Sequence, residues 1–445
     1  MMFKLKVEAK ELNDFGYAVV RVKERNFQIR NMLPGETAEV TFFDNGTGKV
    51  DRLIDKSPLR QKPKCPWYSV CGGCQLQHFA YEEQLEIKQK RLVSLFQKSG
   101  FDIKVILPII GMKEPFNYRN KAQMVISEKG KKIMAGLYEE NTHNIVNVDY
   151  CSIQSEKANE IVKTCRRLLQ EQNIKPYDET RKTGLIRHIY VRTATVTGQI
   201  LVAIVTASER FPGRNNFVKA LRAAHPEITT IIQNINSRQT PIVLGEFERV
   251  LYGIGHIEDE LLGKKHLVSA KTFYQVNHRQ TEILYQKILE FSKPKQDDVV
   301  IDLFAGIGTI GMVFADKAAQ VTCVEANKAS VHNGTLNAKL NHLRNIRFRA
   351  LDVLEYLESF QADEHSVDIV IVDPPREGLK EQIVKVITNI KPKKIVYVSC
   401  NPETLMVDLQ GLVQNGYTIE RVQSIDMFPH TYHVETVVLM SRVDK

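Results

Sequence analysis

From about residue 275 onward, short apolar segments alternate with longer helical stretches. This alternation predicts an α/β domain with a doubly wound, mostly parallel sheet. The predicted strands are VVIDLFA (299–305), QVTCVEA (320–326), IRFRALD (346–352), VDIVIVDPP (367–375), KIVYVSC (394–400) and HVETVVLMSRV (433–443). Ligands of such sheets bind outside the carboxyl ends of the strands. Residues at or just past these ends therefore mark a candidate site: Asp302, Glu325, Asp352, Asp373 and Cys400.

The front of the chain has a different pattern. Residues 1–58 alternate apolar and polar positions in short segments separated by turn signals, which predicts a small five-stranded barrel of the OB type, a scaffold that often binds oligonucleotides. Residues 59–270 are expected to form a central, mostly β domain, with helices near 81–99, 154–172 and 214–224. The third domain is then the α/β unit, residues 271–445.

Charge separates these regions further. The 445 residues carry a net charge of +9, and 43% of them are hydrophobic, which excludes global disorder. Residues 271–445 have a balance of −2 and residues 1–270 a balance of +11, so the front of the chain suits a polyanion. In the barrel, the predicted phosphate contacts and stacking ring are Lys4, Lys6, Arg21, Lys23, Arg25, Arg30 and Phe27. Further basic residues within 161–225 are expected along an RNA path.

Neither a membrane segment nor a secretory signal is predicted. No apolar run approaches the roughly 20 residues of a membrane helix. The first residues also lack the apolar stretch of a secretory signal, so a cytoplasmic location is expected. No obligate protein partner is evident from the sequence.

A glycine-rich turn follows the first strand of the α/β domain. Gly306-x-Gly308-x-x-Gly311 brings backbone close to a ligand, and Glu325 is placed to accept hydrogen bonds from a ribose. Both NAD and S-adenosylmethionine contain a ribose, so an NAD-dependent oxidoreductase is an open alternative. The turn Asp373-Pro-Pro-Arg376 favours a methyltransferase, because it puts a carboxylate and a stiff turn where a planar base must be held.

A reactive cysteine and a buried acid complete the candidate site. Cys400 lies at a strand end near a helix start, where a low-pKa nucleophile is expected. Addition of a thiolate to C6 of a pyrimidine makes C5 able to attack a methyl group, and a base must then remove the C5 proton. Glu435, in an otherwise apolar strand, is the predicted base, with His430 and His433 as possible neighbours.

The cysteines near the barrel suggest a metal centre. Cys65, Cys71 and Cys74 lie within ten residues, and the odd total of seven argues against a disulfide framework. Three clustered ligands with a remote fourth favour a 4Fe–4S cluster over structural zinc. Cys151 is a better fourth ligand than Cys165, which lies in a charged helical stretch. A non-catalytic RNA-binding iron–sulfur protein is therefore a second alternative.

Several motifs together resemble the RumA/TrmA-type RNA 5-methyluridine methyltransferases. They are FYQVN (273–277), DLFAGIGTIG (302–311), VEAN (324–327), DPPREGL (373–379), VSCNP (398–402) and DMFPHTYHVETV (426–437). The resemblance implies Cys400 as nucleophile and Glu435 as base. It also implies S-adenosylmethionine as cofactor, held with the target base by Gln275, Phe304, Thr309, Glu325, Asp352 and Asp373.

The same resemblance covers the front of the chain. RumA-like members have an N-terminal barrel called TRAM and a 4Fe–4S cluster in the central domain, whereas TrmA-like members that act on tRNA lack both. The resemblance therefore implies a Rossmann-like S-adenosylmethionine methyltransferase domain with these two additions. It points to 23S rRNA as substrate, hence to a 23S rRNA (uracil-5-)-methyltransferase.

Overall fold

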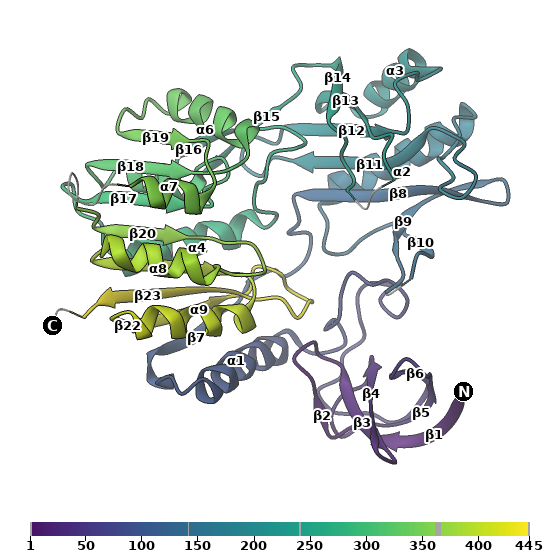
Figure 1. Ribbon diagram of the computed structural model, residues 1–445. Coiled ribbons are helices and arrows are strands. Elements are labelled where there is room, and N and C mark those ends of the chain that lie inside the picture. Colours follow the sequence, from purple (N-terminus) through teal and green to yellow (C-terminus); the bar gives the residue numbers. More distant parts are fainter. Residues whose placement is uncertain (1, 141, 240–241, 361–365, 444–445) are drawn as a thin grey trace.

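The computed structural model describes residues 2–140, 142–239, 242–360 and 366–443. The described residues form three large sheets and one two-stranded ribbon, and the three large sheets lie in separate parts of the molecule (Figure 1). The N-terminal barrel lies at one end, the central sheet and the catalytic sheet lie beyond it, and helix α1 lies along the catalytic sheet (Figure 1). None of the helices in these ranges is long and apolar enough to cross a membrane.

The C-terminal part contains the predicted doubly wound sheet, with eight strands in the order β19-β18-β17-β20-β21-β23-β22-β7. The first five strands in that order are parallel, and β23 runs antiparallel beside β21. Strand order reverses at β17 and β20, which is where such sheets open a ligand crevice. The strands are β7 (Ile106–Ile110), β17 (Val299–Leu303), β18 (Gln320–Val324), β19 (Ile346–Arg349), β20 (Ile369–Val372), β21 (Lys394–Ser399), β22 (Tyr417–Ile425) and β23 (Glu435–Arg442).

Helices cover both faces of this sheet, as its two apolar faces require. They are α4 (His278–Ser292), α5 (Thr309–Ala315), α6 (Lys328–Leu340), α7 (Val353–Ser359), α8 (Glu381–Ile390) and α9 (Pro402–Gln414). One core joins the sheet to α8 and α9, and a second joins it to α4 and α5. The six predicted strands are all present but shorter. The five parallel strands end earlier at their carboxyl ends, and the antiparallel β23 begins two residues later, because the residues at these ends belong to turns beside the site.

Residues 81–110 differ from the predicted domain plan, which placed them in the central domain. Helix α1 (Tyr81–Lys98) packs on α9, and β7 pairs with β22 at the edge of the catalytic sheet. A fully buried ion pair ties α1 to this domain: Lys88 Nζ lies 2.5 Å from Asp426 Oδ1. These residues lie far from the catalytic domain in sequence, so local pattern alone could not assign them to it.

The N-terminal barrel has six strands rather than the expected five, in the order β1-β5-β6-β4-β3-β2. Phe27 is only 3% exposed and packs against Phe42 in the barrel core, so its predicted role as a stacking ring is wrong. Arg30 also differs from its prediction as a phosphate contact. Its guanidinium donates to backbone carbonyls of residues 65–76, here called the cysteine segment, instead of pointing to solvent. The strands are β1 (Phe3–Glu8), β2 (Glu11–Leu12), β3 (Ala18–Val22), β4 (Arg25–Arg30), β5 (Thr37–Phe42) and β6 (Thr47–Asp55).

The central sheet has seven strands in the order β10-β9-β8-β11-β12-β13-β14, covered on one face by α2 (Glu156–Glu171) and α3 (Arg214–Ala224). The two predicted helices are therefore present. The strands are β8 (Lys121–Lys129), β9 (Lys132–Tyr138), β10 (Ile145–Asn147), β11 (Ile186–Thr193), β12 (Ile200–Thr206), β13 (Ile228–Ile235) and β14 (Phe247–Tyr252). A separate ribbon, β15 (Ile257–Leu261) and β16 (Lys264–Val268), leads into the catalytic domain.

Candidate active site

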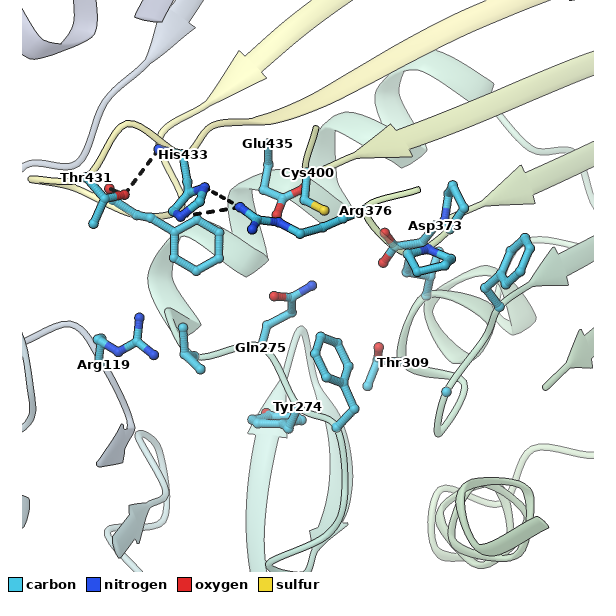
Figure 2. A pocket seen from close by; sticks show the side chains of 18 of the residues that line it. Arg119, Tyr274, Gln275, Thr309, Asp373, Arg376, Cys400, Thr431, His433 and Glu435 are labelled. Carbon is cyan, nitrogen blue, oxygen red and sulfur yellow. Dashed lines mark hydrogen bonds between the residues drawn. The ribbon is translucent and has the colours of Figure 1, made fainter. Parts of the chain in front are cut away.

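A cavity of about 1120 Å³ opens at the carboxyl ends of the catalytic strands. This volume exceeds that of most single-ligand pockets, so it has room for a cofactor and a second group. Seven of the eight residues predicted for catalysis and cofactor binding line it: Gln275, Phe304, Thr309, Glu325, Asp373, Cys400 and Glu435. Figure 2 shows Gln275 and Thr309 on one side of the cavity, with Cys400 and Glu435 facing it from another side.

Asp352 is the predicted cofactor residue that does not line the cavity. It precedes α7, and its Oδ1 accepts a hydrogen bond from the Leu354 amide at 2.9 Å, which is the position of a helix N-cap. The contact that the structure gives Asp352 is thus structural, and its role at the cofactor stays a prediction.

The turn after β17 is shaped for close approach by a ligand. Phe304, Gly306 and Gly308 all have positive φ, at 60°, 56° and 75°. Only glycine adopts this region freely, so the left-handed Phe304 is a strained residue held at the cavity wall. At Gly311 a Cβ would lie 2.4 Å from Cys323 Sγ, so the first turn of α5 must carry glycine to pack on β18.

Glu325 is fixed at the end of β18 by two backbone amides. Its Oε2 accepts from Gly306 N at 3.0 Å, and its Oε1 accepts from Asn327 N at 2.7 Å. Two fixed bonds to a carboxylate leave its remaining lone pairs for a ligand, as a ribose-binding acid needs. Asn327 and Ser330 also line the cavity here, and sequence reasoning missed them.

Tyr285 is a further residue that the sequence analysis did not find. Its hydroxyl lies 2.7 Å from Thr309 Oγ1, and both residues line the cavity. Tyr285 lies within α4, where a lone buried tyrosine gives no signal that separates it from the core. Asp302, at the same end of the cavity, accepts from Gly311 N at 2.9 Å, and burial raises the pKa of its carboxyl to about 7.

Strand register explains how the reactive groups meet. In the antiparallel pair of β21 and β23, Ser399 lies opposite Thr436. The next residues in that register are Cys400 and Glu435, so the thiol and the acid face each other at the strand ends. Asp373 follows directly after β20, the other neighbour of β21. Three adjacent strands therefore deliver a thiol and two carboxyls to one point.

All three groups have a raised pKa. Burial, together with the nearby Glu435 and Asp373 carboxyls, raises the pKa of Cys400 to about 11. Burial raises the pKa of Asp373 to about 7, and burial with Asp373 raises that of Glu435 well above its usual value. The low pKa expected for Cys400 is therefore wrong for the free protein, because burial beside two acids outweighs the helix start that follows.

Arg376 is the cation that opposes this trend, since it lowers the pKa of Cys400. Its carbonyl accepts from Asn401 Nδ2 at 2.9 Å, which holds the Pro-Pro turn against the cysteine turn. Its guanidinium donates to His433 Nδ1 at 2.6 Å, as Figure 2 shows. Burial and Arg376 lower the pKa of His433 to about 3, so this histidine is a neutral acceptor that orients Arg376.

His430 does not line the cavity. It is buried, and its ring nitrogen Nδ1 lies 3.2 Å from the Gln84 amide nitrogen, while its backbone amide donates to Gln84 Oε1 at 3.0 Å. It therefore belongs to the packing of α1 on the catalytic loop.

A second cavity, of about 210 Å³, is lined by all four predicted cluster ligands. Cys65, Cys71 and Cys74 come from the segment after the barrel, and Cys151 reaches them from the loop after β10. All seven cysteines are free, and Cys165 and Cys323 lie buried elsewhere. The structure thus brings together the four thiols that were predicted from the sequence as cluster ligands.

The predicted iron–sulfur cluster itself is not shown. Within the described ranges, no three His, Cys, Asp or Glu side chains stand close enough together to hold a metal ion. A single ion needs its donors around one point, whereas each cysteine of a 4Fe–4S cluster binds a different iron atom. The donor set and the shared cavity fit such a cluster.

The sheet order and the cavity at the carboxyl ends of β17, β18 and β20 define the class: this is an S-adenosylmethionine-dependent methyltransferase fold. A family model described as tRNA (uracil-5-)-methyltransferase matches residues 80–443. The chain belongs to this family of RNA uracil-5 methyltransferases, which confirms the resemblance to the RumA/TrmA type. The family also decides the cofactor that the glycine turn left open: it is S-adenosylmethionine, not NAD.

Similar proteins cover the whole chain. An RNA methyltransferase of Bacillus cereus is 38% identical over 440 residues, covering 98% of this chain and 96% of that protein. One from Halalkalibacterium halodurans is 37% identical over 441 residues, with the same two coverages. The solved structure of Pyrococcus abyssi tRNA (uracil-54, C5)-methyltransferase with S-adenosyl-L-homocysteine is 26% identical and covers 98% of this chain and 100% of its own, with a TM-score of 0.79.

The Pyrococcus match bears on the choice between rRNA and tRNA as substrate. A tRNA enzyme superposes on nearly the full length of this chain, N-terminal barrel region included. The three-part architecture therefore does not by itself separate an rRNA enzyme from a tRNA enzyme, as the resemblance had implied.

Proposed function

We propose that this protein methylates C5 of uridine in 23S rRNA through a covalent bond between Cys400 Sγ and C6 of the base. The observation that supports it is the placement of Cys400, Glu435 and Asp373 at the ends of three adjacent strands, around one cavity. A thiol with a raised pKa is a strong nucleophile once ionised, and a buried carboxylate with a raised pKa is a strong base.

The residues suit a two-stage reaction. Cys400 releases its proton to solvent, and the thiolate adds to C6, which moves the electron pair of the C5–C6 double bond onto C5 and O4. Bound S-adenosylmethionine supplies the methyl group that C5 takes. Glu435 then accepts the C5 proton, the C5–C6 double bond re-forms, and the Cys400 thiolate leaves. Because the ring atoms involved are hidden in a stacked helix, the uridine must first leave its stack.

The charges of the free site set the order of events. Burial raises the pKa of Cys400, Asp373 and Glu435, and the two carboxyls raise that of Cys400 further. Asp373 would lie on the cofactor's side of the cavity, and the positive charge of a bound sulfonium would favour the ionised forms. We infer that the cofactor binds first and that Cys400 becomes reactive only in its presence.

The choice of 23S rRNA rests on the resemblance of the sequence motifs and the cysteine pattern to RumA-like members, since the three-part architecture alone does not separate rRNA from tRNA enzymes. A second candidate is tRNA, because the Pyrococcus enzyme that matches over the whole chain acts on a tRNA uridine. The test is to map 5-methyluridine in 23S rRNA and in tRNA from cells that lack the gene, and to restore it with the wild type or with Cys400→Ala.

Loss of one or more 5-methyluridines from 23S rRNA, restored only by the wild type, is the expected result. Loss from tRNA with intact 23S rRNA would replace the first substrate by the second. Unchanged 5-methyluridine in both RNAs would contradict the reaction itself.

We also propose that Cys65, Cys71, Cys74 and Cys151 hold a 4Fe–4S cluster. It is supported by their shared cavity and by two hydrogen bonds to sulfur: Gln77 Nε2 and the Gly73 amide donate to Cys74 and Cys71 at 3.4 Å. Methyl transfer moves no electrons, so the expected role is structural. Anaerobically purified protein should contain about four iron and four sulfide per chain. Zinc without iron or sulfide would contradict the cluster.

A further inference from the structure

The N-terminal barrel reaches into the catalytic cavity. Phe15 and Tyr17, from the turn between β2 and β3, line the same cavity as Cys400, although nearly 400 residues separate them in sequence. The turn is well formed: Asn13 Oδ1 accepts from the amides of Phe15 and Tyr17, each at 3.0 Å. A side-chain cap of this kind fixes the direction in which the tip of the turn projects.

Contacts with two other segments hold this turn in place. At Gly16 a Cβ would lie 2.4 Å from Leu76 Cδ2, so the turn packs directly on the cysteine segment. The Tyr17 hydroxyl donates to Glu140, and Arg30 pairs with that same carboxylate at 3.1 Å. The barrel is therefore docked at its cavity side and not loosely tethered.

The cysteine segment is in turn bonded to the catalytic domain. The amides of Gln75 and Leu76 both donate to the carbonyl of His430, at 3.0 and 2.9 Å. Barrel turn, cysteine segment and the catalytic loop 426–434 thus form one continuous contact. The position of Phe15 relative to the active site is set by these bonds.

Packing leaves part of the Phe15 side chain exposed. Its side chain is 43% exposed, although its ring lies against Tyr432 with centroids 5.1 Å apart and planes at 87°. The Arg91 guanidinium lies 6.0 Å from the Phe15 ring and donates to the Tyr432 carbonyl at 3.3 Å. An aromatic ring that is held from several sides and still exposed to a cavity is suited to bind a flat apolar group.

A series of side-chain contacts connects Phe15 with the reactive thiol, and three side chains lie between them in that series. Tyr432 stacks near His433 with centroids 4.1 Å apart, and His433 binds Arg376, the cation that acts on Cys400. Phe15 therefore stands at the far end of a row of side chains that starts at the reactive thiol. A base stacked on Phe15 is a neighbour of the target uridine, not the target.

We propose that Phe15, held against Tyr432, stacks on a nucleobase next to the target uridine, so that the barrel takes part in selecting the RNA site. This inference rests on the proposed function, since it needs an RNA whose uridine enters the cavity. The partner is RNA because this family methylates uracil in RNA. Arg119 and Lys271 line the cavity and can contact phosphate, beside five carboxyl side chains that also line it. Every base has a π-face, so a stacking ring gives affinity without a base-specific hydrogen bond.

The test compares Phe15→Ala with Phe15→Trp and with Phe247→Ala on a synthetic RNA centred on the uridine that the wild-type enzyme methylates. Phe247 is a matched control, because it is 72% exposed on β14 and does not line the cavity. Phe15→Ala should raise KM for RNA about 5- to 100-fold, the range measured for loss of one base–aromatic stack. KM for S-adenosylmethionine should not change, and Phe15→Trp and Phe247→Ala should remain close to wild type.

An abasic scan gives a readout that a purely structural role of Phe15 would not affect. One base at a time is removed from the three nucleotides on each side of the target. At one position the wild type should lose affinity and Phe15→Ala should lose nothing further, because the stacked pair is already broken. If the affinity loss from base removal and the loss from Phe15→Ala multiply at every position, the inference is overturned. An unchanged KM for RNA in Phe15→Ala would overturn it as well. These results are distinct from a failure of the proposed function, in which the wild-type enzyme methylates no RNA.

Discussion

Cys400 and the four cysteines that line the smaller cavity have surroundings that differ in a way that separates their expected roles. Cys400 faces two carboxyls and the Arg376 cation at the wall of a cavity of about 1120 Å³. The four cysteines after the barrel face one another in a cavity of about 210 Å³. Burial raises the pKa of the thiol in both places, so protonation alone does not distinguish a nucleophile from a ligand.

What distinguishes them is the neighbouring chemistry. Beside Cys400 stands Glu435, an acid opposite it in strand register that can take a proton from a substrate. The four-cysteine cavity has no acid among its lining residues, and its polar lining is amide, hydroxyl and cationic side chains. A thiol beside a proton acceptor in a large cavity suits turnover, and four thiols that line one small cavity suit binding of a permanent ligand.

Removal of the Cys400 thiol is expected to have the largest effect. Cys400→Ala deletes the atom that bonds to C6, so methylation should fall by about 10⁴-fold or more. Binding of S-adenosylmethionine, measured by calorimetry, should be retained, because the cofactor end of the cavity is unchanged. Turnover within tenfold of wild type would show that the reaction does not pass through this thiol.

Loss of the base should trap the reaction one step later. Glu435→Gln keeps the shape of the side chain but cannot accept the C5 proton, so turnover should fall about 10²- to 10⁴-fold. The methylated RNA should remain bonded to Cys400 and appear as a protein–RNA band that survives denaturing electrophoresis. The double variant Cys400→Ala, Glu435→Gln is the control and should give no such band. Normal turnover in Glu435→Gln would assign the base elsewhere.

A change in the second thiol group should affect folding and not chemistry. Cys74→Ser removes one proposed cluster ligand, so the iron content and the melting temperature should both fall. The folded fraction that remains should keep kcat within about threefold, since no cysteine of this group reaches the reacting atoms. A large loss of kcat at unchanged stability would contradict the division between the two groups.

Substitution of Arg376 is expected to have the smallest effect, and that effect is specific to the Cys400 thiol. It lowers the pKa of Cys400, so Arg376→Gln should raise that pKa and reduce the thiolate fraction at any pH below it. Iodoacetamide labelling of Cys400, followed by mass spectrometry of its peptide, should be several-fold slower in Arg376→Gln between pH 7 and 9. In both proteins the labelling rate should rise about tenfold per pH unit, because the pKa of about 11 lies above this range.

Arg376→Lys is the control for this measurement. It keeps the positive charge and should stay closer to wild type than Arg376→Gln does. Faster labelling of Cys400 in Arg376→Gln would contradict the electrostatic role.

Sequence reasoning succeeded where function depends on local pattern. The strand-end rule placed Glu325, Asp373 and Cys400 correctly around one cavity, because successive parallel strands end at the same edge of a sheet. It did not do so for Asp352, whose carboxylate caps α7. Both uses put an acid directly after a strand, and a single sequence cannot tell them apart.

Other sequence predictions were wrong where packing between distant residues determines the burial or the pKa of a side chain. Phe27 has the same alternating surroundings in sequence as an exposed strand residue, yet the barrel closes over it. The pKa of Cys400 depends on Glu435 and Asp373, which come from separate strands. Phe15 gave no signal at all, since an aromatic residue in a turn is unremarkable until the turn is docked against Tyr432.

The sequence by itself determined six of the eight strands of the catalytic sheet, the thiol and the acid that we propose for the chemistry, the four cysteines that share a cavity, and the family. Local periodicity and ligand spacing carry that information. Only the tertiary structure decided how the parts act on one another. It placed the barrel turn at the cavity and residues 81–110 in the catalytic domain. It also raised the pKa of Cys400, so that this residue is a protonated thiol and not a thiolate in the free protein. The reason is that burial and charge are set by neighbours distant in sequence.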